Sequence, residues 1–180
     1  NGGVTWKHTL YIDDNTGISD IVMDPNNSRV LFAGAWQLKL KTWIRVSGGP
    51  GSGVFKSIDG GLSWNKLKDN GLPKKDVGKI ALAMTPASPD RLYALIETGD
   101  GIPYNGKETE SGELWRSEDN GKTFKLINSN RELGSRQAYY TRTAASPDNA
   151  NEVYFISYRF FSSIDGGVSL ENRSQLSSPN

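Results

Sequence analysis

Three aspartates that recur in one eight-residue setting are the most prominent potentially reactive groups of the sequence. They occupy the third position of the octets Ser57–Trp64, Ser117–Phe124 and Ser163–Leu170, which begin with serine and have glycine at position five. A carboxylate and a hydroxyl beside glycine are suited to accept hydrogen bonds from the N–H groups of a tight turn. The octets are therefore predicted to be structural turns, defined by Ser57, Asp59, Gly61, Trp64, Ser117, Asp119, Gly121, Phe124, Ser163, Asp165 and Gly167.

The acidic candidates for catalysis are Asp20 and Asp14. Asp20 lies on a strand expected to face the axis of the fold, and it could supply one of the two carboxyl groups that glycoside hydrolysis requires. Asp14 follows Asp13, and such a pair is equally suited to a turn. The sequence holds one histidine and no cysteine, so thiolate chemistry is excluded and a serine–histidine–aspartate triad is hard to assemble. No complete catalytic template is present.

The first of two irregular segments combines aromatic and basic residues. The two segments are Gln37–Ser52 and Thr98–Gly112. Insertions on a rigid scaffold often carry binding residues, and tryptophan beside lysine or arginine suits contact with a carbohydrate or a protein. The alternative is that these side chains pack against a neighbouring part of the fold. The predicted binding residues, including those expected near the axis, are Trp36, Trp43, Arg45, Arg136, Tyr139, Tyr140 and Arg142.

The elements that must position these residues repeat along the chain. Pro25, Pro86 and Pro147 are spaced 61 residues apart, and a short apolar run lies on each side of every one of them. Another apolar pair precedes each octet. Because proline cannot continue a strand ladder and the octet is a turn, each unit is predicted to contain four antiparallel strands, as in one blade of a β-propeller.

The fold class is therefore predicted to be all-β, a partial β-propeller of about three four-stranded blades over residues 1–180. The expected parts are the last strand of a preceding blade at 1–10, blades at 17–69 and 78–128, and an incomplete blade at 138–180. Closed propellers typically have about four to eight blades. The remainder of a propeller, in a longer chain or in other chains, is the expected partner.

The octets resemble the Asp-box repeat, also called the bacterial neuraminidase repeat. That repeat occurs in sialidases, sortilin-type receptors, xyloglucan-cleaving glucanases and a photosystem assembly factor, so the resemblance implies a fold more than an activity. The rest of the chain looks closest to bacterial sortilin-like and glycosyl hydrolase-like repeat proteins. That likeness is carried by Asp13–Gly17, Ser19–Pro25, Gly49–Gly53, Tyr139–Tyr140 and Ser146–Asp148. Sialidase activity is not expected, because Arg45 is followed by Val46 and Ser47 where a sialidase has Ile-Pro.

Composition narrows the partners and the location. The net charge of +1 gives no electrostatic basis for binding nucleic acid. No apolar run approaches the ~18–20 residues of a membrane span, so direct membrane insertion is not expected. With His8 as the one histidine and no cysteine, we expect no metal site and no cofactor. In keeping with the resemblance, we expect an extracellular, periplasmic or cell-envelope location.

Three functions fit these residues. The preferred one is a non-catalytic propeller module that binds a protein or a glycan, because the aromatic and basic segment meets the needs of binding and no residue set meets those of catalysis. The first alternative is part of a glycoside hydrolase that acts on polysaccharide, with its carboxylates partly outside the chain. The second is an accessory or assembly subunit of a membrane complex.

Overall fold

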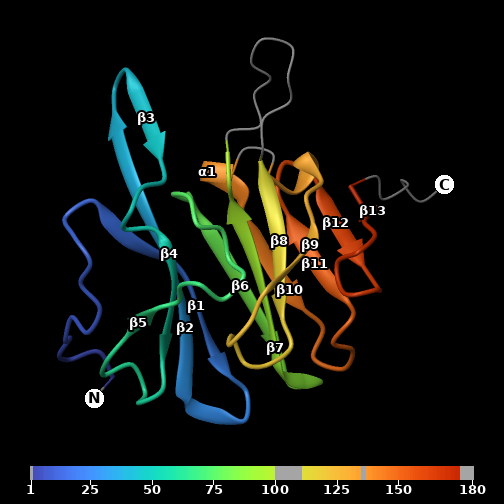
Figure 1. Ribbon diagram of the computed structural model, residues 1–180, viewed down its shortest axis with the longest axis horizontal. Coiled ribbons are helices and arrows are strands. Elements are labelled where there is room, and N and C mark those ends of the chain that lie inside the picture. Colours follow the sequence, from blue (N-terminus) through green and yellow to red (C-terminus); the bar gives the residue numbers. More distant parts are fainter. Residues whose placement is uncertain (1, 100–110, 135–136, 175–180) are drawn as a thin grey trace.

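Three antiparallel four-stranded sheets, arranged side by side as blades, form the molecule (Figure 1). The computed structural model describes residues 2–99, 111–134 and 137–174. The first blade contains β1 (Thr16–Asp24), β2 (Asn27–Lys41), β4 (Gly53–Ser57) and β5 (Asn65–Lys66), with β3 (Ile44–Ser47) paired to the far end of β2. The second contains β6 (Ile80–Thr85), β7 (Ser88–Glu97), β8 (Gly112–Ser117) and β9 (Lys125–Asn128). The third contains β10 (Arg142–Ala145), β11 (Val153–Ile156), β12 (Phe160–Ser163) and β13 (Glu171–Asn172).

Each blade is an antiparallel meander whose turns lie where the sequence places its turn signals. Pro25 and Pro86 lie between the first and second strands of their blades, and the third and fourth strands are joined by an octet in every blade. The predicted fold class is confirmed: the chain is all-β and is a partial propeller of four-stranded blades. A 3₁₀ turn, η1 (Arg131–Gly134), and a four-residue helix, α1 (Gln137–Tyr140), connect the second blade to the third.

Apolar side chains fill the two spaces between the blades. Between the first and second blades the core contains Phe32, Val54, Ile80 and Ile96, all almost completely buried. Between the second and third blades a separate core is built around Tyr93, Leu114, Leu133, Val153 and Phe155. Burial of such side chains contributes about 1.5–3 kcal/mol each, so contact between blades is a main source of stability.

The segment that precedes β1 contains no strand. Residues 2–15 instead run along the outer face of the first blade, where Leu10 and Ile12 pack with Trp64 against Ala33, Ala35 and Phe55. A fourth strand needs the third strand of its own blade as hydrogen-bonding partner, and residues 2–15 have no such partner here. Assignment of residues 1–10 to a preceding blade stays a prediction.

The innermost strands β1, β6 and β10 are joined by polar contacts across the blades. Ser19 Oγ donates a hydrogen bond to the carbonyl oxygen of Ile80 at 2.7 Å, and the Leu82 N–H donates to the Asp20 carboxylate at 3.0 Å. Arg142 Nη1 donates to the Ser19 carbonyl oxygen at 3.2 Å, linking the third blade to the first. These contacts fix the three strands relative to one another and form the inner rim on which the candidate site is built.

Candidate functional site

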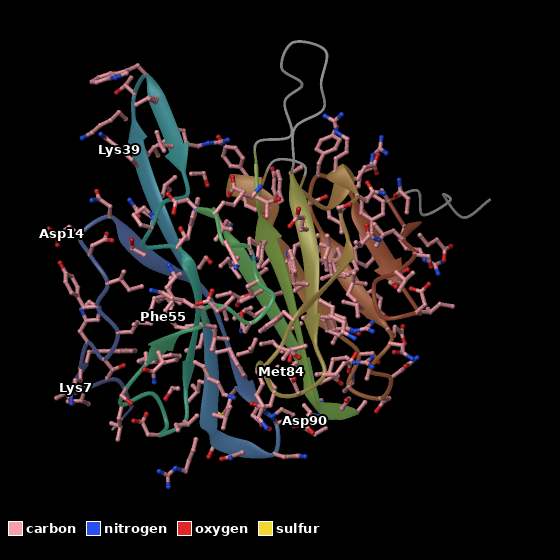
Figure 2. All side chains as sticks on the ribbon, viewed as in Figure 1. Lys7, Asp14, Lys39, Phe55, Met84 and Asp90 are labelled. Carbon is pink, nitrogen blue, oxygen red and sulfur yellow. The ribbon has the colours of Figure 1, made fainter. Side chains whose placement is uncertain are left out.

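A β-hairpin projects from the first blade at the rim where the ends of β2 and β7 and the start of β6 meet. It consists of residues 37–47, the far half of β2 and all of β3, with Leu40 opposite Arg45. Figure 2 shows Lys39 on this hairpin, beyond the end of the other first-blade strands. Trp43 at its tip is 83% exposed. The hairpin therefore presents an aromatic and basic surface of its own.

A buried polar cluster anchors the base of this hairpin to the second blade. We call it the rim cluster: Trp36, Ser47, Lys79 and Glu97. Trp36 Nε1 donates to Ser47 Oγ at 2.9 Å, and Ser47 Oγ donates to Glu97 Oε2 at 2.6 Å. The same carboxylate oxygen accepts the Lys79 N–H at 2.8 Å. Because Glu97 and Lys79 are only 6% and 7% exposed, these bonds act with little competition from water.

The Lys79 ammonium lies near an aromatic ring and near charges of both signs. Its Nζ atom lies 5.3 Å from the centroid of the Trp36 ring, a cation–π distance. Burial lowers the pKa of Lys79 and repulsion from Arg142 lowers it further, while attraction to Glu97 and Asp20 acts in the opposite direction. The cluster therefore couples the hairpin to charged groups on all three blades.

A cavity of about 570 Å³ lies between the hairpin and the end of β7. We call it the rim cavity. Its lining comprises Arg45, Val46, Ser47, Asp76, Gly78, Glu97, Thr98 and Gly99. The lining includes two carboxylates and one guanidinium, and the volume is within the usual range of ligand sites. The rim cavity can accommodate a peptide side chain or a sugar unit.

The structure brings two of the predicted binding residues together and places the others separately. Arg45 and Tyr139 come together, since the guanidinium carbon lies 5.9 Å from the centroid of the tyrosine ring and thereby connects the hairpin to α1. Tyr140 is the next residue of α1 and is half-exposed. Arg142 donates a hydrogen bond to the Ser19 carbonyl oxygen on the inner rim. Trp36 lies in the rim cluster and Trp43 stands apart at the hairpin tip. Arg136 lies outside the described residues.

Both acidic candidates for catalysis are engaged in local hydrogen bonds. Asp20 accepts the Ile21 N–H through Oδ1 and the Leu82 N–H through Oδ2, so each oxygen has a backbone donor. Asp14 accepts the hydroxyl of Tyr11 at 2.6 Å, and Figure 2 shows it at the outer margin of the first blade. In this arrangement Asp20 ties two inner strands together, and Asp14 is remote from the rim cavity.

Each octet closes a hydrogen-bond network around its aspartate. In the second octet, Asp119 Oδ1 accepts the Ser117 hydroxyl at 2.7 Å and the Thr123 N–H at 2.8 Å, while Oδ2 accepts the Thr123 hydroxyl at 2.6 Å. The Ser117 oxygen in turn accepts the Gly121 N–H at 2.8 Å. The first and third octets repeat these contacts around Asp59 and Asp165. The oxygens of these carboxylates are occupied within their own turns.

Acid is expected to destabilise the protein as the pH falls from about 4 to about 2. Hydrogen bonds, above all from the hydroxyls of Thr123 and Ser169, lower the pKa of Asp119 and Asp165 from 3.8 to about 2, and the Ser63 hydroxyl lowers that of Asp59. A carboxyl group with a lowered folded-state pKa contributes stability that is present above its unfolded pKa and lost as the pH falls through the folded one. Urea midpoints measured between pH ~5 and ~2 test this. Asp119→Asn, which does not titrate, should flatten the dependence, and an unchanged slope in that variant would contradict the assignment.

Sequence reasoning missed three members of the rim cluster: Ser47, Lys79 and Glu97. One signal was available, because Glu97 ends the otherwise apolar run Leu92–Ile96 on a strand predicted to be buried. A charged residue at such a place needs a partner. The identity of that partner was not accessible, because Ser47 is 50 residues away along the chain.

The structure was also compared with the sequence for a metal site and for a membrane-spanning helix, neither of which the sequence leads us to expect. Among the described residues, no group of three or more His, Cys, Asp or Glu side chains is placed to hold a metal ion. Within the same part of the chain, no helix has both the length and the apolar character needed to cross a membrane.

Comparison with known proteins identifies similarity in fold. No protein-family model matches the chain, and no curated protein sequence matches it. Among solved structures, the GH74 enzyme of Niastella koreensis superposes with a TM-score of 0.61 at 17% identity, over 96% of this chain and 25% of that one. YCF48 from Cyanidioschyzon merolae gives 0.58 at 13% identity, over 88% and 40%. YCF48 bound to D1 peptide gives 0.56 at 11% identity, over 91% and 42%. The chain spans less than half the length of each of these proteins, with which it shares the β-propeller fold.

Proposed function

We propose that this chain is a non-catalytic propeller module that binds a protein or a glycan at the hairpin and the adjoining rim cavity. The observation that carries the proposal is the pairing of Arg45 with Tyr139, on a hairpin that has the exposed Trp43 at its tip and is anchored by the buried Glu97 carboxylate. Aromatic and arginine side chains contribute most of the affinity at many interfaces. A surface held in place before binding loses less conformational entropy when the ligand arrives.

The hydrogen bonds that Glu97 and Asp20 accept favour a binding role for the rim over a catalytic one. Glu97 Oε2 accepts two hydrogen bonds, and both oxygens of Asp20 accept backbone N–H groups. A general acid or base must instead exchange a proton with a substrate atom within hydrogen-bonding reach. In this arrangement Glu97 and Asp20 hold the scaffold together, and Trp43, Arg45 and Tyr139 are available to a ligand.

A protein with the same fold supports the proposal that the ligand is a protein. YCF48, whose propeller resembles this chain, has been solved with a D1 peptide bound. We further propose that the octets are true Asp-box repeats, that the chain belongs to the family of proteins built from them, and that it works in an exported or envelope-associated bacterial protein. An accessory role in the assembly of a membrane complex is one form that such binding would take.

Substitutions on the hairpin test the proposal. The protein is screened on arrays of peptides and glycans, and the affinity for the best ligand is then measured by calorimetry. Trp43→Ala and Arg45→Ala should each weaken binding by about tenfold or more, because they remove an aromatic and a charged contact. The matched control is Lys125→Ala, an exposed residue of β9 away from the hairpin. Binding that survives both hairpin substitutions would contradict the proposal.

A glycoside hydrolase is the second candidate. It is favoured by the two carboxylates, Asp76 and Glu97, that line the rim cavity, and by the shared fold with a GH74 enzyme. If the protein is a glycoside hydrolase, polysaccharides incubated with it should yield new reducing ends, and Asp76→Asn or Glu97→Gln should abolish them. If no reducing ends form while hairpin-dependent binding is present, the binding module stands.

A further inference from the structure

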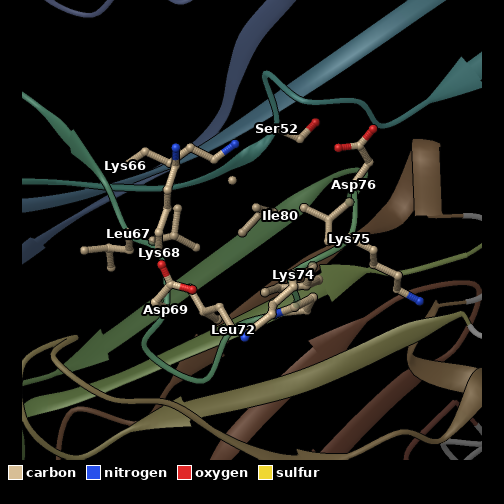
Figure 3. Close-up of a pocket in the computed structure, with 15 residues that line it drawn as sticks. Ser52, Lys66, Leu67, Lys68, Asp69, Leu72, Lys74, Lys75, Asp76 and Ile80 are labelled. Carbon is tan, nitrogen blue, oxygen red and sulfur yellow. The ribbon is translucent and has the colours of Figure 1, made fainter.

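A second cavity, of about 330 Å³, lies between the first and second blades beside the linker that joins them. The linker comprises residues 67–79. We call this cavity the linker pocket. Figure 3 shows Lys66 and Lys68 on one side of it, Lys74 and Lys75 on another, and Ile80 between them. The linker pocket is separate from the hairpin, although Asp76 lines both cavities.

The floor of the linker pocket is apolar and rigid. It is made of Val54, Val77, Ile80 and Ile96, which are 1%, 7%, 0% and 2% exposed and belong to the core between the blades. These four side chains leave almost no surface open to a ligand, and the accessible apolar wall is formed by the half-buried Leu67, Leu72 and Pro73. Such a wall favours a ligand with a hydrocarbon or aryl part, because apolar surface is removed from water on binding.

The rim of the linker pocket is positively charged. Four lysines and two aspartates line it, and Lys66 is half-buried with its ammonium 2.7 Å from the Pro50 carbonyl oxygen. Burial lowers the pKa of Lys66, and repulsion from Lys68 lowers it further. An anion placed between these two lysines would relieve their repulsion and form charge-assisted hydrogen bonds.

Backbone contacts hold the walls of the linker pocket open. The Leu67 N–H donates to the Val54 carbonyl oxygen at 2.8 Å, and the Phe124 N–H donates to the Asn70 carbonyl oxygen at 2.7 Å. Gly71 has φ +100° and is pressed so closely against Phe124 that a Cβ atom there would lie 2.1 Å from its carbonyl oxygen. The linker is therefore fixed to both blades in the absence of ligand, and the pocket is preformed.

The next linker fills the corresponding space with protein. Leu133 lies 61 residues after Leu72, the same spacing as the prolines, and it is completely buried in the core between the second and third blades. The 3₁₀ turn η1 carries Leu133 inward, whereas Leu72 stays half-buried at the wall of the linker pocket. Leu72 packs against the edge of the core between the first and second blades and keeps part of its surface open to the linker pocket, whereas Leu133 has none exposed.

We propose that the linker pocket is a binding site for a small amphipathic anion, an organic carboxylate whose aryl or alkyl part lies against Leu67, Leu72 and Pro73 and whose carboxylate lies between Lys66 and Lys68. Neutral ligands of the same shape bind less well, because they do not offset the repulsion between the two ammonium groups, which the attraction of Lys66 to Asp76 opposes but does not outweigh.

Titration with 4-phenylbutyrate, followed by NMR of the backbone amides, tests the proposal. Saturable shifts are expected at Leu67, Lys68, Leu72 and Val77, which line the pocket. The uncharged probe 4-phenylbutanamide should bind about tenfold more weakly to the unmodified protein, since it lacks the charge-assisted bonds. Equal affinity for the two probes, absence of saturable shifts at millimolar concentration, or shifts confined to other residues would each overturn the proposal.

Two substitutions and one control locate the site. Lys66→Met keeps the side-chain stem and removes the charge, and it should weaken 4-phenylbutyrate binding by about tenfold. Leu72→Phe adds bulk at the pocket wall and should also weaken it. Lys7→Met, which removes an exposed lysine far along the chain from the pocket, should leave the affinity unchanged. Thermal unfolding measurements show whether each variant is folded. The comparison of 4-phenylbutyrate with 4-phenylbutanamide uses the unmodified protein, so it tests the proposal even if a variant fails to fold.

Discussion

Gly121→Ala is expected to lower the free energy of unfolding by about 2–4 kcal/mol, as measured by urea denaturation. Gly121 has φ +78°, and a Cβ atom at this position would lie 2.6 Å from Cε1 of Phe32. The left-handed backbone costs a residue with a side chain about 1–2 kcal/mol, and overpacking a core costs about 1–3 kcal/mol. Both costs apply, because the octet of the second blade rests directly on a buried ring of the first.

Gly61→Ala is the matched control, since Gly61 occupies the same position in the first octet. Its φ is +86°, but the nearest atom to an added Cβ is Cζ2 of Trp64 at 3.5 Å, an ordinary contact. Only the backbone cost of about 1–2 kcal/mol is therefore expected. The difference between the two variants measures the contact between blades. Equal losses would show that the octet of the second blade does not bear on Phe32.

Glu97→Ala is expected to lower the free energy of unfolding by about 3 kcal/mol and to detach the hairpin from the second blade. The substitution leaves the Ser47 hydroxyl and the Lys79 N–H without their acceptor, and hydrogen bonds to a charged group contribute about 1.5–3 kcal/mol each. Hydrogen exchange should accelerate in β3 and at the start of β6. Urea denaturation and exchange rates together measure both effects.

Glu97→Gln is the control for charge, because the amide keeps one oxygen that can accept both bonds, as Oε2 does, and removes the negative charge. A loss of about 1 kcal/mol and near-normal exchange in β3 are expected. If Glu97→Ala were no more damaging than Glu97→Gln, the carboxylate would not be the anchor of the hairpin. Since Glu97 acts through Ser47, the alanine variant should also weaken binding at the hairpin by displacing Arg45 from Tyr139.

The fold could be predicted from the sequence because its determinants are local and repeated. In each octet the hydrogen bonds of the aspartate and the serine join residues two to four apart, so the eight residues specify their own turn. The 61-residue spacing of Pro25, Pro86 and Pro147 then repeats one four-stranded unit. The positions of the octet turns and the order of the strands follow from these signals, whereas strand lengths do not: β2 runs on to Lys41 because its far half pairs with β3. The short α1 does not follow from them either, because it has too few residues to show a helical period.

The candidate site could be predicted only in part. The hairpin segment was identified by its aromatic and basic composition, and the pairing of Arg45 with Tyr139 joins two residues that the sequence singled out separately. Their role in binding stays a prediction. The anchoring residues were not identified, because Glu97, Ser47 and Lys79 come from three different elements and have no common pattern along the chain.

The sequence by itself determined the blade, the octet turn and the order of the strands, because each depends on contacts between residues close together in the chain or on exact repetition. The tertiary structure alone decided which charges are buried together and where space remains. Leu72 and Leu133 occupy the same place in the repeat, yet one lines the linker pocket and the other fills a core. That difference arises because the packing of the linkers against adjacent blades joins residues far apart in sequence.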